Sequence, residues 1–339
     1  MTVTVGIKAY NEESHIAAAI TSALDAVRPL GGDVVLADSG STDGTIAIAR
    51  QFPIKIVQLA NASERCCGAG AQLAFQNNTG EYFYILDGDM ILKPDFLTAA
   101  VNYLQQNAKV AAVGGLVREV NTEALEFQIR ANSVNQGQGW LPGSVDRLDC
   151  GGLYRTSALR EVGYFADKNL HAFEEFELGA RLRQKGWLLA RIDKEAIDHF
   201  GHAMDGYALL WRRIKSGYSG ASGEIIRSAM GRQHFSVIVR SFSHFRNGVA
   251  VVAWWTSLAV IALLPFSIGL KLALFALFLL TPLVGLAVRR RSLVLGLYSF
   301  VAWNVSAWGL VAGFFRGRRS PEDPIESVLI SNGATGNSA

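Results

Sequence analysis

Short apolar runs alternate with amphipathic segments along the first quarter of the chain. Period-two or continuous apolar patterns, rich in β-branched and aromatic residues, indicate strands at 2–7, 33–38, 54–60 and 81–87. Apolar positions three and four residues apart indicate helices at 11–24, 46–52 and 69–78. This alternation predicts an α/β domain with a mostly parallel sheet covered by helices on both faces.

Beyond residue 93 the pattern becomes less regular. It predicts a helix near 95–107, a strand at 110–117, a polar helix near 121–136, a glycine-rich turn at 136–144 and a helix at 174–186. Open α/β sheets bind ligands beyond the carboxyl ends of their strands. The polar residues that fall at those ends are Tyr10, Asn11, Asp38 and the pair Asp87 and Asp89.

The distribution of charge changes after Arg246. Charged residues make up 18% of the whole chain, but within 248–315 they occur only at Lys271 and at the run 289–291. Spans at roughly 248–264, 270–288 and 293–315 each approach the length that a helix needs to cross about 30 Å of hydrocarbon. Three such spans in succession favour transmembrane helices over buried core helices.

The flanking arginines bear on membrane orientation. The amino terminus shows no signal-peptide pattern, so we expect a cytoplasmic first domain and a multi-pass protein of the inner (cytoplasmic) membrane. Arg240, Arg246 and the arginines of 289–291 fit cytoplasmic ends of the first two spans. The arginines at 316, 318 and 319 do not fit a third crossing. Two spans with a re-entrant or interfacial segment therefore stand beside three spans.

The net charge of +3 comes largely from these membrane-flanking arginines and points to anionic lipid headgroups rather than nucleic acid. The three cysteines, Cys66, Cys67 and Cys150, are odd in number and lack metal-ligand spacing. We expect no disulfide.

The tripeptide Asp87, Gly88, Asp89 ends the fourth predicted strand. Two carboxylates so close repel each other unless a cation or several hydrogen-bond donors accompany them. Mg²⁺ is typically held by one or two carboxylates together with substrate phosphates, so a cation with a diphosphate is one interpretation. A solvated turn is the other.

Two later segments carry further candidates. Glu174 and Glu175 begin a predicted helix, where acidic residues either favour the helix dipole or supply a general base. His199 and His202 could hold a metal or serve as packing residues. Gly151 and Gly152 form either a plain loop or a turn that passes close under a ligand.

These segments together resemble glycosyltransferase family 2, the inverting nucleotide-sugar enzymes with the Rossmann-like GT-A fold, over about residues 2–215. AYNEE (9–13) is similar to the family's P-x-YNEE element, although Lys8 and Ala9 stand where proline is usual. LADSGSTDGT resembles DDGSTDGT with Ser39 for the second Asp, and ILDGDMIL resembles the D-x-D element. CGGLYRTSALREVGYF and EEFELGARLRQKGW resemble the acceptor-side segment and the catalytic helix.

The resemblance implies a role for each matched residue. It implies Glu175 as catalytic base, with glutamate in place of the usual aspartate, and Asp89 and His199 as ligands of a divalent metal, Mg²⁺ or Mn²⁺; Asp87 and His202 are alternative ligands. Asp38 would read the uracil edge and Asp87 the ribose and sugar. The full set expected to bind the nucleotide sugar is Ala9, Tyr10, Asn11, Glu12, Asp38, Arg65, Asp87, Gly88, Gly151, Gly152 and Glu174.

We therefore expect a GT-A domain at 1–215, an amphipathic linker at 216–247, a transmembrane region at 248–315 and a polar tail at 316–339. The expected activity is metal-dependent, inverting transfer from a nucleotide-diphosphate sugar to a lipid-linked or other saccharide acceptor at the membrane. The absence of Q-x-x-R-W after residue 205 disfavours a processive polymerase. Two alternatives stay open: a polyprenyl-phosphate sugar synthase and a catalytically inactive nucleotide-sugar-binding protein.

A dinucleotide-dependent oxidoreductase is disfavoured. GAGAQLA (68–74) has Leu73 where the third glycine of that fingerprint belongs, and it follows the third strand rather than the first.

Overall fold

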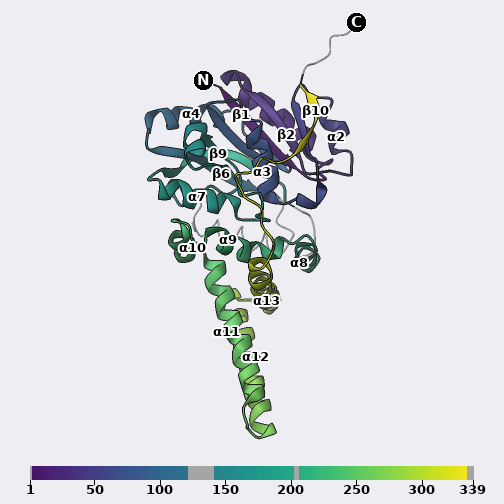
Figure 1. The fold of residues 1–339 in the computed structure, drawn as a ribbon, viewed down its shortest axis with the longest axis vertical. Coiled ribbons are helices and arrows are strands. Elements are labelled where there is room, and N and C mark those ends of the chain that lie inside the picture. The colour runs from purple at the N-terminus through teal and green to yellow at the C-terminus, as the bar shows by residue number, and fades with distance from the viewer. Residues whose placement is uncertain (1, 121–140, 202–205, 334–339) are drawn as a thin grey trace. The chain divides into compact units, whose positions relative to one another are not determined.

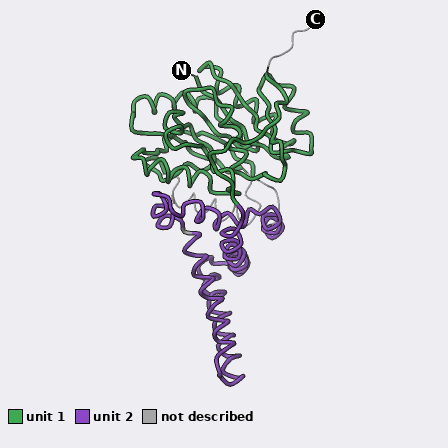
Figure 2. Tube along the Cα trace, viewed as in Figure 1, with its two compact units in different colours: residues 1–203, 318–339 green, residues 204–317 purple. Residues whose placement is uncertain are grey.

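The computed structural model describes residues 2–120, 141–201 and 206–333. The chain divides into two compact units, residues 1–203 with 318–339 and residues 204–317 (Figure 2). The helix predicted near 121–136, most of the turn at 136–144 and His202 lie outside the described residues.

The strands of the first unit form one mixed sheet in the order β10-β3-β2-β1-β4-β8-β6-β9-β5, with β7 on β9 (Figure 1). Four neighbouring strands, β3, β2, β1 and β4, are parallel, as the sequence predicts. β8 is antiparallel to β4 and β6, and β9 is parallel to β6. The strands are β1 (Val3–Ala9), β2 (Asp33–Asp38), β3 (Lys55–Leu59), β4 (Tyr82–Asp87), β5 (Met90–Leu92), β6 (Val110–Glu119), β7 (Gly143–Val145), β8 (Gly152–Arg155), β9 (Leu188–His199) and β10 (Ser327–Asn332).

Helices cover both faces of this sheet because side chains of a strand alternate between its faces. Val5 and Ile7 pack with Ile16 and Ile20 on one face, and Phe83 packs with the helix that follows β3 on the other. The helices of this unit among the described residues are α1 (Ile16–Val27), η1 (Arg28–Leu30), α2 (Thr45–Ala49), η2 (Ala62–Glu64), α3 (Cys67–Gln76), α4 (Phe96–Gln106), α6 (Thr156–Glu161) and α7 (Glu174–Gln184).

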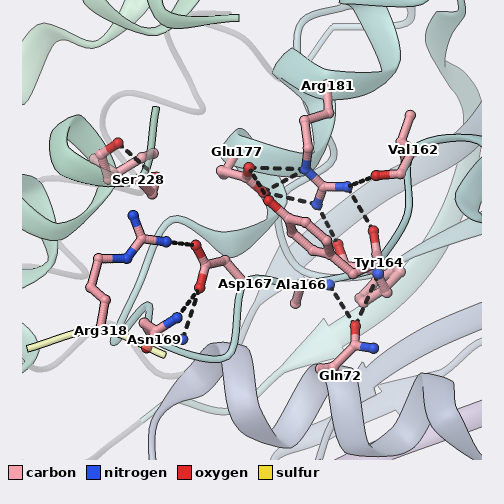
Figure 3. A network of polar contacts seen from close by, with 12 residues as sticks. Gln72, Val162, Tyr164, Ala166, Asp167, Asn169, Glu177, Arg181, Ser228 and Arg318 are labelled. Atoms are coloured by element: carbon pink, nitrogen blue, oxygen red, sulfur yellow. Dashed lines mark hydrogen bonds and ion pairs between the residues drawn. The ribbon is translucent and has the colours of Figure 1, made fainter. Parts of the chain in front are cut away.

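The predicted polar tail contains a strand, which the sequence pattern did not indicate. β10 pairs antiparallel with β3, from Ser327 opposite Leu59 to Asn332 opposite Lys55. Arg318 forms an ion pair with the buried Asp167 (Figure 3), and Gln76 exchanges two hydrogen bonds with the backbone of Ile325.

The second unit is helical. Three of its helices are long and apolar enough to cross a membrane: His244–Leu263, Ile268–Arg290 and Leu293–Phe314. The side chains of Ser267 and Ser292 cap the second and third of these at their amino ends. The elements are α8 (Gly206–Lys215), η3 (Tyr218–Gly220), α9 (Ala221–Ala229), α10 (Phe235–Ser241), α11 (Ser243–Leu263), α12 (Ile268–Arg290) and α13 (Leu293–Phe314).

Candidate active site

The carboxyl ends of β1, β2 and β4 bring the predicted donor-binding residues together. Lys8 lies opposite Asp87 and Ala9 lies opposite Asp38 in the parallel register. The Gly88 N–H donates to the carbonyl of Lys8 at 3.0 Å, which holds the turn after β4 against the end of β1. A Cβ at position 88 would lie 2.9 Å from Cγ of Glu12, so only glycine fits without a shift.

Asp38 organises the loop that follows β2. Its side chain is fully buried and accepts hydrogen bonds at 2.8 Å from the N–H groups of Gly40 and Ser41 and from Nε2 of Gln58. Asn11, in the left-handed region with φ 57°, accepts from the N–H of Thr42 at 2.8 Å. The two matched segments therefore fix each other, while a direct contact between Asp38 and a base stays a prediction.

Arg65 lies beside Tyr10, another of the predicted donor-binding residues. Its guanidinium carbon stacks 3.7 Å from the centre of the Tyr10 ring, and its Nε donates to the carbonyl of Ser39 at 2.8 Å. These two contacts hold the planar guanidinium of Arg65, so it is oriented before any ligand binds.

Lys8 is a central residue that the sequence analysis did not select. Its Nζ lies 3.2 Å from Oδ1 of Asp87 and 2.8 Å from Oε1 of Glu174, so it joins the D-x-D turn to the first turn of α7. Burial alone would lower the pKa of Lys8, but Asp87 and Glu174 raise it well above its ordinary value. The signal available in the sequence was a charged residue inside the apolar run VTVGIKA.

A buried network of polar contacts holds α7 in place. Arg181 forms an ion pair with Glu177 at 2.8 Å and donates to the carbonyls of Tyr164 and Phe165 at 2.6 and 2.9 Å (Figure 3). Glu174 and Glu175 occupy the first turn of the same helix. Because their helix is fixed, both side chains have a defined position near the carboxyl ends of β1 and β4.

Glu175 has the electrostatic properties of a general base. Burial raises its pKa well above the ordinary glutamate value; Lys8 opposes this shift, and Asp149 adds to it. Its Oε1 accepts a hydrogen bond from the N–H of Gly151 at 3.4 Å. Gly151 has φ 92° and a Cβ there would lie 2.9 Å from the Tyr84 hydroxyl, so glycine is required at this approach.

His199, at the end of β9, connects two carboxylates. Its Nε2 lies 3.5 Å from Oδ2 of Asp89, and its Nδ1 lies 2.7 Å from Oε2 of Glu119. Burial lowers the pKa of His199, but the hydrogen bonds and charges of Asp89 and Glu119 outweigh it and raise the pKa to about 9.

These residues fit a divalent cation. Carboxylate oxygen with imidazole nitrogen is a common ligand set for such ions, and a carboxylate on the other ring nitrogen usually orients the histidine. Among the described residues, possible ligand atoms of Glu119, Cys150 and His199 also lie within 4.8 Å of one another. Glu119 and Cys150 were missed in the sequence because they come from β6 and from the loop before β8, far from the D-x-D turn.

The sequence of this chain is similar to those of known proteins. Residues 4–163 match the family model of Glycosyl transferase family 2. The succinoglycan biosynthesis protein ExoA of Rhizobium meliloti (strain 1021) is 26% identical over 73% of this chain and 78% of its own length. EpsE of Bacillus subtilis (strain 168) is also 26% identical, over 68% of this chain and 89% of its own length.

Solved structures show the same fold. The mannosyltransferase PcManGT from Pyrobaculum calidifontis, in complex with GDP-Man and Mn²⁺, has a TM-score of 0.60 at 19% identity and covers 91% of this chain and 86% of its own. S. aureus TarS with UDP-GlcNAc has a TM-score of 0.53 at 18% identity, over 69% and 68%. The fold is thus of the GT-A type, and residues 4–163 match a glycosyl transferase family 2 domain, which supports a glycosyltransferase.

Proposed function

We propose that this glycosyltransferase moves a sugar, with inversion and with the help of a divalent metal, from a nucleotide-diphosphate sugar to a membrane-associated acceptor. The observation that carries the proposal is the convergence of Asp87, Asp89, Glu174 and Glu175 at the carboxyl ends of the strands, with Lys8 between Asp87 and Glu174. Four acidic side chains with one buried lysine have an excess of negative charge, which suits a cation and its diphosphate.

In this proposal Asp89 and His199 hold the metal, and Glu119 orients the His199 ring through Nδ1. When bound, the ion supplies Lewis-acid stabilisation of the departing nucleoside diphosphate. Asp87 binds the ribose and sugar side, and Arg65, which stacks on Tyr10, is a second cation near the diphosphate.

Glu175 removes the proton from the acceptor hydroxyl as the oxygen of that hydroxyl attacks the anomeric carbon. The carbon–oxygen bond to the diphosphate breaks in the same displacement, and the leaving group departs from the opposite face. A base with a raised pKa is suited to this step near neutral pH.

Three observations support the choice of donor and acceptor. Neighbours of the fold bind UDP-GlcNAc or GDP-Man, and we favour a uridine donor because of the Asp38 loop. ExoA is a succinoglycan biosynthesis protein, and this chain has three candidate membrane helices. We therefore propose a lipid-linked saccharide acceptor in surface polysaccharide or glycolipid synthesis, at the inner membrane.

A panel of nucleotide-diphosphate sugars offered to the purified full-length protein, with and without EDTA, tests this function. We expect release of nucleoside diphosphate from one donor class when a lipid-linked saccharide is present, and loss of release in EDTA that Mn²⁺ or Mg²⁺ restores. Turnover that is unchanged in EDTA would contradict the metal dependence. Donor binding with no turnover on any acceptor would favour an inactive binding protein.

The charges around Glu175 predict a pH dependence with opposite signs in two variants. A base works only when deprotonated, so activity falls as the pH drops through the raised pKa of Glu175. Asp149→Asn removes a charge that raises this pKa, so the acid limb of kcat/KM should move to lower pH. Lys8→Met removes a charge that lowers it, so the limb should move to higher pH.

Asp146→Asn is the matched control for this measurement, because Asp146 is exposed and pairs with Arg183, which lies at the other end of α7 from Glu175. Its pH profile of kcat/KM should equal that of the wild-type protein. Shifts of the acid limb in the same direction for Asp149→Asn and Lys8→Met would exclude Glu175 as the titrating base.

A further inference from the structure

The chain leaves the first unit at residue 203 and returns to it at residue 318. β10 belongs to the same hydrogen-bonded sheet as β1, through β3 and β2. Arg318 of the returning segment forms an ion pair with Asp167, and Lys168 donates a hydrogen bond to the carbonyl of Asp323. These contacts hold the returning segment on this unit. An open sheet with polar edges does not extend through hydrocarbon, so both ends of the chain lie on one side of a membrane. Residues 204–317 must then cross it an even number of times.

Two of the three apolar helices form a hairpin. Only residues 264–267 separate α11 from α12, and Nε1 of Trp254 donates to the carbonyl of Phe278 at 2.9 Å. Trp254 precedes the connecting segment by about as many residues as Phe278 follows it, so the two helices run antiparallel side by side. The amino end of α11 and the carboxyl end of α12 consequently lie together, at what we call the open end of the hairpin.

Both ends of α13 lie at this open end. Near its start, a Cβ at Gly296 would be 2.6 Å from the Cα of Ala287, close to the carboxyl end of α12. Near its end, Cδ2 of Leu310 would be 2.9 Å from a Cβ at Gly248, close to the amino end of α11. A third crossing helix would have its two ends at opposite ends of the hairpin. Figure 1 likewise shows α13 beside the end of α11 and α12 that is nearest to α9.

The carboxyl half of α13 packs against charged segments. A Cβ at Gly309 or Gly313 would lie 1.8 or 1.9 Å from the carbonyls of Ser219 and Gly220, so these backbones touch directly. The buried Glu224 of α9 pairs with Arg316, and Nη1 of Arg227 donates to the carbonyl of Phe314 at 2.7 Å. Charged groups of this kind lie at the membrane boundary far more cheaply than at its centre.

The remaining surface of α13 is apolar and exposed. Leu293, Val294 and Leu297 are exposed near its start, and Trp308 and Val311 near its end. Arg289 and Arg290 end α12, and Arg291 lies in the short connection to α13. Apolar side chains next to cationic ones are typical of helices that lie in the headgroup region of an anionic membrane.

We propose that α11 and α12 alone cross the membrane, and that α13 lies within the lipid leaflet that faces the compartment of the sheet. The partner of α13 is thus the lipid surface, with the arginines of 289–291 at anionic headgroups. This arrangement places the arginines at 316, 318 and 319 on the same side as Arg240 and Arg246, which removes the conflict seen in the sequence.

Membrane-impermeant maleimide labelling of the full-length protein in intact cells and in inverted vesicles tests this topology. Phe266→Cys lies in the connection of the hairpin and Phe315→Cys follows α13; both positions are exposed. We expect labelling of Phe266→Cys only from the face opposite an amino-terminal tag, and of Phe315→Cys only from the face of that tag. The wild-type protein gives the background of its three cysteines.

A second measurement does not depend on the substitutions. Tags at both termini of the wild-type chain should become protease-sensitive from the same face of the membrane. Termini on opposite faces, or labelling of Phe315→Cys and Phe266→Cys from one common face, would overturn the proposal. Neither result would affect the proposed transfer reaction, which is assayed separately.

Discussion

Glu175→Gln is expected to lower kcat for transfer by about 10³-fold while the affinity for the nucleotide-sugar donor changes little. Glutamine keeps the shape of the side chain, including an oxygen that can accept from the Gly151 N–H, but it cannot take a proton. Single-turnover transfer and calorimetric donor binding would separate the two effects.

The matched control for this variant is Glu81→Gln. Glu81 is exposed and precedes the amino end of β4, whereas the candidate site lies at the carboxyl end. Its kcat should equal that of the wild-type protein. Transfer by Glu175→Gln at the wild-type rate would contradict the base assignment. It would favour the polyprenyl-phosphate alternative, because a phosphate acceptor is already ionised and needs no base.

Asp89→Asn is expected to abolish the metal dependence of donor binding and to lower kcat/KM by about 10³-fold, since Lewis-acid stabilisation contributes several kcal/mol. Glu119→Gln should have an intermediate effect, a loss of about 10- to 100-fold in Mn²⁺ affinity, because in the proposed site Glu119 acts through the orientation of His199. Titration of Mn²⁺ by electron paramagnetic resonance measures this affinity without turnover.

Asp95→Asn is a suitable control for both substitutions, because Asp95 lies just beyond β5 and is exposed. Its Mn²⁺ affinity should match the wild type. Equal Mn²⁺ affinity in the wild-type protein and in Asp89→Asn would contradict the metal site, whatever the activity of the variant.

The sequence pattern was sufficient for the parts of the fold that depend on local spacing. The strand at 33–38 was predicted with its observed bounds, and the other strands of the parallel core within about two residues. The apolar spans match the three long helices for the same reason, since length and composition suffice to identify them. The position of the site at the strand ends follows from the general rule for α/β sheets.

The missed features all depend on contacts between distant segments. The role of Lys8 becomes clear only when the β1 and β4 register places it opposite Asp87. Glu119 becomes relevant because β6 pairs in parallel with β9 and ends beside His199. Nothing local in SVLISN distinguishes an edge strand from a short apolar patch in a tail. Pairing over such separations is decided by tertiary packing, which periodicity does not report.

The last strand of the sheet has a consequence for how this protein is made. β3 cannot gain its outer neighbour until the ribosome has synthesised the entire hydrophobic segment and released residues 327–332 from its exit tunnel. During translation the edge of β3 therefore stays unpaired, and an unpaired strand edge can pair with another chain and cause aggregation. A shortened protein that ends before α11, the usual route to a soluble form, would keep that defect permanently.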